Sequence, residues 1–229
     1  MIDLVSLGEM MLRLSPPKHE RLRRAAALDV RACGAQFNLA ANFAALGKHS
    51  LFLSQLPDNE LGHLARSLGQ SYGVDMSQVQ LGDTPKIGLV FVEFSLAPRR
   101  QVHLYDRQGS AASRISPADF AWSEILQGAH FAHTDGIFPA LGAGPRQAAL
   151  AFLKAARECG CTASFDVNFR ESLWPPDDAL ALYRQALLLK AAGWAARRTA
   201  NTSATMVRTY GSMTAKSEGM LMALICSQT

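Results

Sequence analysis

The chain has 229 residues, of which 48% are hydrophobic and 18% charged, and its formal net charge at pH 7 is +4. This content of apolar side chains is enough for a folded core, so the composition excludes collagen-like, mucin-like and wholly disordered proteins. No apolar run approaches the roughly 18 residues of a membrane helix, and Asp3 and Glu9 lie where a secretory signal would be basic and then apolar. We therefore expect a soluble, cytoplasmic protein without a membrane partner.

The basic excess is concentrated near the end of the sequence. Residues 191–229 contain four basic side chains and one acidic side chain, which leaves a charge of +1 for residues 1–190. No basic stripe with interleaved aromatic side chains occurs in that longer part, so we expect no nucleic-acid partner. The cysteines predict no metal site, because Cys159 and Cys161 are one residue apart and no second pair faces them.

Apolar periodicity predicts alternating strands and helices in the first part of the chain. The expected elements are a strand at 2–8, extended segments at 11–15 and 26–32, a helix at 37–46, a strand at 49–53 and a helix at 58–72. Gly47 and Gly73 are placed to end the two helices. We predict that the second helix turns four apolar side chains inward, namely Leu61, Leu64, Ala65 and Leu68.

The second part of the chain continues the alternation. The expected elements are a hairpin of strands at 87–94 and 101–105, a short helical region from 116, a strand at 129–133, a helix at 143–158, a strand at 162–167 and a helix at 177–190. This order predicts an α/β fold with a mostly parallel sheet. Ligands of such sheets bind beyond the carboxyl ends of the strands, here near residues 8–9, 133–137 and 166–170.

Three local clusters near these positions could bind a ligand. Asp166, Asn168 and Arg170 directly follow a strand, and the planar guanidinium of Arg170 suits a carboxylate or phosphate. The alternative for Arg170 is a salt bridge to Asp166 or Glu171, and the residue types alone favour neither reading.

The other two clusters come earlier in the chain. Tyr105 and Arg107 alternate at the end of a strand, so both side chains lie on one face, either facing a ligand or solvated. Gly34 begins a turn of small residues that allows close approach of backbone N–H groups, and Asn38 could bind a hydroxyl or cap the turn. A tight strand-to-helix turn explains Gly34 equally well.

Six short motifs occur together in a specific order and spacing. They are residues 8–17 (GEMMLRLSPP), 34–40 (GAQFNLA), 56–62 (LPDNELG), 105–111 (YDRQGSA), 135–137 (DGI) and 166–174 (DVNFRESLW). Over about residues 1–190 this set resembles the ribokinase-like (PfkB) carbohydrate kinases, and within them the 2-keto-3-deoxygluconate kinases.

The resemblance implies a ribokinase-like fold and ATP-dependent phosphorylation of a sugar acid, with Mg²⁺ as the accompanying metal. It also implies a small β lid, built from about residues 10–32 and 87–106, which excludes water and often mediates dimers in the family. A homodimer through the lid is therefore expected. The implied substrate-binding residues are Gly34, Asn38, Tyr105, Arg107, Asn168 and Arg170. We expect Arg107 and Arg170 to converge on one pocket for the sugar acid.

The sequence departs from the family pattern in its last part. Cys33 stands where the family usually has a glycine, and Val90 where related kinases often have a tyrosine. The family's Asn-Glu-Glu segment, its glycine-rich nucleotide strand and its Gly-Ala-Gly-Asp turn, which carries the general base, do not occur, so no catalytic or nucleotide-binding residue is assigned. We interpret residues 191–229 as an aberrant tail from a frameshift or truncation, and a helix near 204–225 is the alternative.

These departures lead to two hypotheses for the chain as it stands. The first is a sugar-acid kinase by descent with negligible turnover, because phosphoryl transfer depends on positioning and charge stabilisation that the missing segments would supply. The second is a non-catalytic remnant that binds a sugar acid or dimerises.

Overall fold

The computed structural model describes residues 1–191. Residues 192–229, which hold nearly all of the predicted tail and the whole of the alternative helix near 204–225, lie outside the described residues. Within the described part, no helix is both long and apolar enough to span a membrane. The cysteines of that part, Cys33, Cys159 and Cys161, are free thiols.

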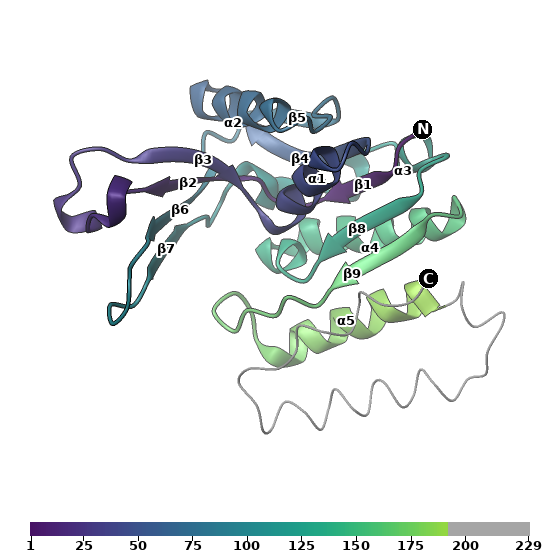
Figure 1. Cartoon of the computed structure of the whole chain (residues 1–229). Helices are drawn as coiled ribbons and strands as arrows, with labels where there is room; N and C mark the ends of the chain where they lie inside the picture. Colours follow the sequence, from purple (N-terminus) through teal and green to yellow (C-terminus); the bar gives the residue numbers. More distant parts are fainter. Residues whose placement is uncertain (192–229) are drawn as a thin grey trace.

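The main sheet has five parallel strands in the order β5-β4-β1-β8-β9 (Figure 1). The strands are β1 (Leu4–Leu7), β4 (Ser50–Pro57), β5 (Val79–Gly82), β8 (Phe131–Asp135) and β9 (Thr162–Asp166). Their parallel pairing confirms the α/β prediction. Because all five run the same way, the polar residues that follow β1, β8 and β9 gather at one edge of the sheet.

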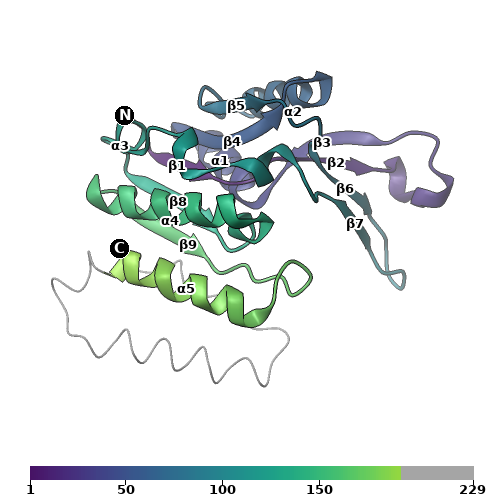
Figure 2. The same cartoon turned by 180° about the vertical axis from the view of Figure 1, so that it is seen from behind.

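Helices cover both faces of the main sheet, as Figure 2 shows from behind. They are α1 (Ala35–Ala45), α2 (Glu60–Ser71), α3 (Trp122–Leu126), α4 (Ala143–Glu158) and α5 (Pro176–Ala191). Alternate residues along a strand point to opposite faces, so Phe52 packs with α1 and α2, whereas Leu51 and Leu53 pack with α4. The helix α5 packs against α4 and β9 around Phe165.

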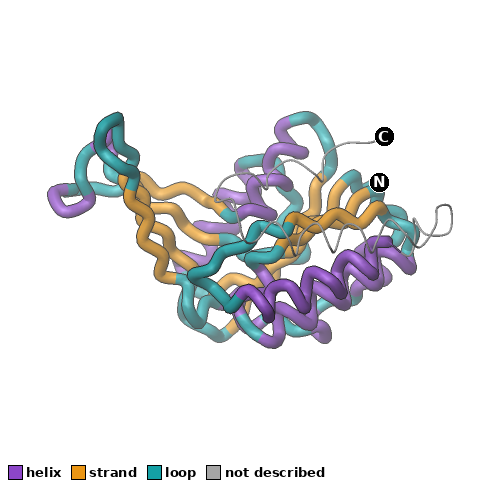
Figure 3. Tube along the Cα trace, turned by 90° about the horizontal axis from the view of Figure 1, so that it is seen from below, coloured by secondary structure: helices purple, strands orange, loops and turns teal. Residues whose placement is uncertain are grey.

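A second sheet, called the lid sheet below, projects beyond the carboxyl edge of the main sheet (Figure 3). Its strands, in the order β3-β2-β6-β7, are β2 (Met11–Ser15), β3 (Asp29–Cys33), β6 (Gly88–Glu93) and β7 (Val102–Asp106). The antiparallel pair β6 and β7 confirms the predicted hairpin. The chain passes from β1 into β2 through Gly8, Glu9 and Met10, so Glu9 lies where the two sheets meet.

The predicted inward face of α2 is wrong for two of its four residues. Leu61 and Leu64 are 46% and 39% exposed, whereas Gly62, Ala65 and Gly69 are buried. A Cβ atom on Gly62 would lie 1.9 Å from the carbonyl oxygen of Pro57. Small residues at 62, 65 and 69 therefore let α2 approach β4 closely, and this contact overrides the apolar pattern. The short strand β5 was also not predicted.

Short 3-10 helices complete the described structure, at Pro17–His19, Leu22–Arg24, Ala111–Arg114, Pro117–Asp119 and Phe138–Leu141. A side-chain cap begins α2, since the Asn59 side chain accepts hydrogen bonds from the backbone N–H groups of Leu61 and Gly62, both at 3.1 Å. The bounds of α4 also agree with the helix predicted at 143–158.

Candidate functional site

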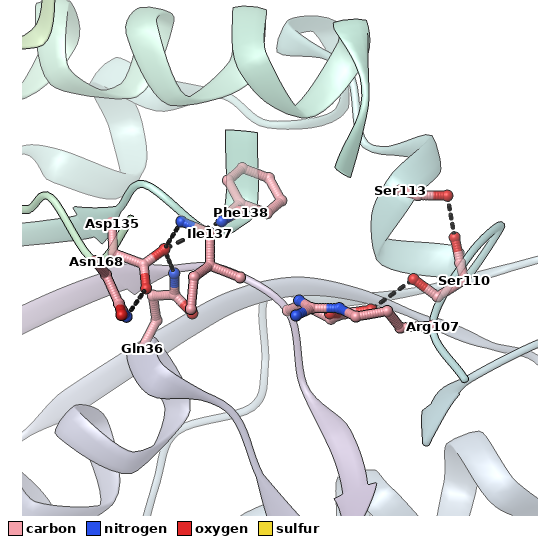
Figure 4. Close-up of polar contacts among 9 residues, drawn as sticks. Gln36, Arg107, Ser110, Ser113, Asp135, Ile137, Phe138 and Asn168 are labelled. Carbon is pink, nitrogen blue, oxygen red and sulfur yellow. Dashed lines mark hydrogen bonds and ion pairs between the residues drawn. The ribbon is translucent and has the colours of Figure 1, made fainter. Parts of the chain in front are cut away.

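Asp135 is the centre of a buried polar cluster at the carboxyl end of β8 (Figure 4). Its Oδ1 atom accepts hydrogen bonds from the backbone N–H groups of Ile137 at 2.9 Å and Phe138 at 3.0 Å, and from the Gln36 amide. Its Oδ2 atom accepts a hydrogen bond from Nδ2 of Asn168 at 2.9 Å. The carboxyl group thus ties α1 and the loop after β9 to the end of β8.

The electrostatic state of Asp135 follows from its burial. The side chain is fully buried, and loss of hydration raises the pKa of its carboxyl group to about 6. The hydrogen bonds from Phe138, Asn168 and Ile137 favour the ionised form and oppose this rise in pKa. Desolvation is the larger effect, because these donors are neutral and no basic group is among the causes that lower the pKa.

Asn168 reaches Asp135 from a strained turn after β9. Its backbone φ is +34°, in the left-handed region that non-glycine residues rarely adopt. The turn is held by a hydrogen bond from the Asn168 backbone N–H to Oδ1 of Asp166, at 3.0 Å. The turn carries the chain on to Arg170, so the Asp135 cluster sets the start of the predicted ligand-binding segment.

Glu9 is the centre of a second buried cluster, where the two sheets meet. Its side chain is 2% exposed, forms an ion pair with Arg107, and accepts a hydrogen bond from Oγ of Ser110 at 2.6 Å. Burial raises the pKa of Glu9, while the charge of Arg107 and the Ser110 hydroxyl oppose the rise. Because Arg107 follows β7, this ion pair ties the lid sheet to the end of β1.

Gly34 packs directly against the backbone of this second cluster. A Cβ atom on Gly34 would lie 2.2 Å from the carbonyl oxygen of Glu9, and the φ of Gly34 is +150°. Only glycine is compatible with both features. The structure therefore supports the tight-turn reading of Gly34.

The remaining predicted residues lie around these clusters. Arg107 is not solvated, since its side chain is 11% exposed and paired with Glu9. Tyr105 is 59% exposed on β7, opposite Val90 of β6. Asn38 is exposed in the first turn of α1, and its side chain does not cap that helix.

Arg170 is exposed, and its guanidinium donates a hydrogen bond to the carbonyl oxygen of Phe169 at 3.1 Å. Among residues 1–191 it forms no salt bridge, so neither Asp166 nor Glu171 neutralises it, as the alternative reading required. No described contact joins Arg170 to Arg107, and the convergence of the two guanidinium groups stays a prediction. Figure 4 shows the guanidinium end of Arg107 directed toward the side of the Asp135 cluster.

The sequence reasoning assigned no role to Glu9, Gln36, Ser110 or Asp135, although the structure buries all of them. Glu9 and Asp135 could have been found from their places at strand ends, because Glu9 follows the buried strand β1 after one glycine and Asp135 is the acidic residue that ends β8. Gln36 and Ser110 carried no such signal, since their partners are 99 and 101 residues away in the sequence.

Within residues 1–191, no three or more His, Cys, Asp or Glu side chains are grouped for metal binding. The acidic residues of the two clusters are each satisfied by protein donors.

Comparisons with known proteins agree with this geometry. Residues 1–214 match the family described as pfkB family carbohydrate kinase, a match that extends past residue 190. The chain is 37% identical over 177 residues to a 2-dehydro-3-deoxygalactonokinase of Haloferax volcanii, covering 77% of this chain and 55% of that protein. It is 32% identical over 190 residues to a 2-dehydro-3-deoxygluconokinase of Thermoproteus tenax, covering 82% and 56%.

A solved structure shows the same fold. The 2-dehydro-3-deoxygluconokinase of Thermotoga maritima superimposes with a TM-score of 0.77 at 37% identity, covering 80% of this chain and 56% of that one. The expected ribokinase-like fold is thereby confirmed. The chain spans about half the length of the curated relatives it matches.

Proposed function

The chain belongs to the pfkB family of carbohydrate kinases, and on that premise we propose that its function is the ATP-dependent phosphorylation of a sugar acid such as 2-keto-3-deoxygluconate. The names of its relatives support this substrate class, since two of them act on 2-dehydro-3-deoxy sugar acids by name. A cytoplasmic location and a homodimer through the lid sheet belong to the same proposal.

The observation that carries the proposal is that the guanidinium of Arg170 is exposed and unpaired with any described acidic residue. It lies beyond the carboxyl end of β9. An arginine in this position is available to a carboxylate through two parallel hydrogen bonds. The neighbouring Asn168, fixed by Asp135, offers an amide to a hydroxyl group of the same ligand.

Arg107 offers a second guanidinium group to the sugar acid at this edge of the main sheet. Its guanidinium is held by Glu9, but its Nε atom is buried and has no hydrogen-bond partner within residues 1–191. Glu9 therefore fixes the cation of Arg107 at this edge, and Arg107 would attract the sugar acid through its charge. Tyr105 and Asn38 offer further donors, and the tight turn at Gly34 permits close approach of the ligand to the backbone.

These residues bind and orient the sugar acid, and closure of the lid sheet excludes water from it. ATP would supply the phosphoryl group. The Gly-Ala-Gly-Asp turn that carries the general base in this family does not occur among the 229 residues. We therefore propose that this chain by itself binds the sugar acid with negligible turnover, and the alternative is a non-catalytic sugar-acid-binding or dimerising protein.

Calorimetric titration with 2-keto-3-deoxygluconate tests the binding proposal. We expect saturable binding, and about tenfold weaker binding by Arg170→Ala, which corresponds to about 1.4 kcal/mol. Arg157→Ala, which removes an exposed arginine from α4, is the control and should bind as the parent does. Fructose, which lacks the carboxylate, should bind neither protein measurably.

The outcomes separate the parts of the proposal. Equal affinity of the parent and Arg170→Ala contradicts the role of this arginine, and equal affinity for fructose contradicts recognition of an acid. A coupled assay for ADP release tests turnover by the chain alone. Sugar-acid-dependent ADP release well above the background without sugar would show that the absence of the Gly-Ala-Gly-Asp turn does not prevent catalysis.

A further inference from the structure

The outer end of the lid sheet is the most basic part of the described molecule. Residues 13–31 and 93–100 together carry eight basic and three acidic side chains, a net charge of +5, although the whole chain has only +4. Residues 1–190 carry +1 in total, so the rest of that part is net acidic. The small net charge of this part of the chain therefore conceals a strong separation of charge between the lid sheet and the body.

A cavity of about 270 Å³ opens in this basic region. Its polar lining consists of Arg13, Ser15, Lys18, His19, Asp29 and Arg31. Three of these side chains are permanently cationic and one is acidic, so the lining has a net charge of +2 with His19 neutral. The cavity is smaller than the roughly 300–1,000 Å³ of pockets for drug-sized ligands, which limits an occupant to a small molecule.

Two arginines in the cavity face one another without an acid to separate them. Arg13 of β2 and Arg31 of β3 are direct cross-strand partners, so their side chains lie on the same face of the lid sheet. Like charges in this position destabilise a sheet. Within residues 1–191 neither arginine forms a salt bridge. Arg13 is instead fixed over the ring of Phe94, with its guanidinium carbon 5.3 Å from the ring centroid.

Unpartnered polar atoms lie beside this pair. Ser15 is 6% exposed, and its Oγ atom is buried without a hydrogen-bond partner. The Nε atom of Arg13 is buried and unpartnered as well. Buried polar groups nearly always have partners in folded proteins, and a hydroxyl and a guanidinium N–H can both donate to one anionic oxygen group.

We propose that this cavity, the lid pocket, binds a small phosphate dianion, either inorganic phosphate or a phosphomonoester. The net charge of +2 matches a dianion, an anion between Arg13 and Arg31 removes their mutual repulsion, and the Ser15 hydroxyl gains a partner. Asp29 would repel a free phosphate but could accept a hydrogen bond from a hydroxyl group of a phosphorylated sugar. Arg107, Asn168 and Arg170 are not among the residues that line the lid pocket, which has its own donors.

Calorimetric titrations with inorganic phosphate and with glucose 6-phosphate, at low ionic strength and without sugar acid or ATP, test the proposal. We expect saturable binding of at least one probe, with about tenfold weaker binding by Arg31→Gln and a smaller loss in Ser15→Ala. Arg24→Gln removes the same charge from the same region outside the cavity and should bind normally. Arg31 is exposed, so its substitution leaves the fold intact.

The two sources of phosphate give different results, and both support the lid pocket. Tighter binding of glucose 6-phosphate, lost in Asp29→Asn, identifies a phosphomonoester, whereas tighter binding of inorganic phosphate identifies the free ion. Three results would overturn the proposal: no binding of either probe at millimolar concentration, equal weakening by Arg31→Gln and Arg24→Gln, or affinity that falls as protein concentration rises, which would place a carboxylate of a second copy in the pocket. Arg170→Ala should leave phosphate binding unchanged, which separates this proposal from that of the sugar-acid site.

Discussion

Glu9 and Asp135 lie at the carboxyl ends of adjacent parallel strands, and the protein stabilises these two buried carboxyl groups in different ways. Glu9 has a full cationic partner in Arg107 and one hydroxyl donor in Ser110. Asp135 has only neutral donors, two from the backbone and two from side-chain amides. Burial raises the pKa of both, but only Glu9 has a neighbouring cation to oppose that effect.

The two clusters also connect different parts of the fold. The ion pair of Glu9 joins the lid sheet to the main sheet, since Arg107 follows β7 and Glu9 follows β1. The Asp135 cluster joins α1 and the loop after β9 within the main body. Glu9 is held by a cationic donor between the sheets, and Asp135 is held by uncharged donors inside the body, so the two clusters should respond differently to mutation and to pH.

The largest expected effect comes from removing the cation between the sheets. Arg107→Met leaves the carboxyl group of Glu9 buried without its charge partner, which typically costs about 3–5 kcal/mol of the free energy of unfolding. Urea denaturation followed by tryptophan fluorescence measures this loss. The double variant Glu9→Gln/Arg107→Met should recover much of it, because no charge is then left unpaired.

A loss below about 1 kcal/mol in Arg107→Met would contradict this comparison. It would mean that water reaches Glu9 when the arginine is removed, and that the ion pair contributes no more than an exposed one.

The next effect is a pH dependence that belongs to Asp135. Its pKa is about 6 in the folded protein, against 3.8 for an unperturbed carboxyl group. Between these values the folded state retains a proton that the unfolded chain has released, so the free energy of unfolding falls as the pH rises from about 4 to about 6 and then levels off. The fall attributable to Asp135 is about 3 kcal/mol.

Asp135→Asn isolates this contribution, since the amide does not titrate. Urea denaturation of the parent and the variant at several pH values should show a steeper fall for the parent between pH 4 and 6. Parallel profiles would show that the four donors balance desolvation and keep the pKa of Asp135 near its usual value.

The fold was largely predictable because its signals are local. The apolar strand before Gly8, the helix stops at Gly47 and Gly73, and the cap at Asn59 all act within a few residues, and the structure agrees with each. The inward face of α2 was not predictable, because it depends on the contact between Gly62 and the carbonyl group of Pro57. Close packing through glycine leaves no apolar pattern to read.

The candidate site was predictable in its position but not in its contacts. Parallel strands place their carboxyl ends together, so residues after β1, β8 and β9 were expected at one edge. The partner of Arg107 was not predictable, because Glu9 lies 98 residues earlier in the sequence. The separation of charge between the lid sheet and the body was missed for a related reason, since two distant segments combine to form the basic end.

The smallest expected effect is at an exposed ion pair, which serves as the reference for Glu9 and Arg107. Lys154 and Glu158 lie one turn apart on α4, with Nζ and Oε1 4.0 Å apart and side chains 63% and 56% exposed. Because water and salt screen this pair, Lys154→Ala should change the free energy of unfolding by less than about 0.5 kcal/mol. The same denaturation assay measures it, at low and at high salt. A loss comparable to that of Arg107→Met would mean that burial does not distinguish the two ion pairs, and the comparison of cationic and uncharged donors at the sheet edge would lose its physical basis.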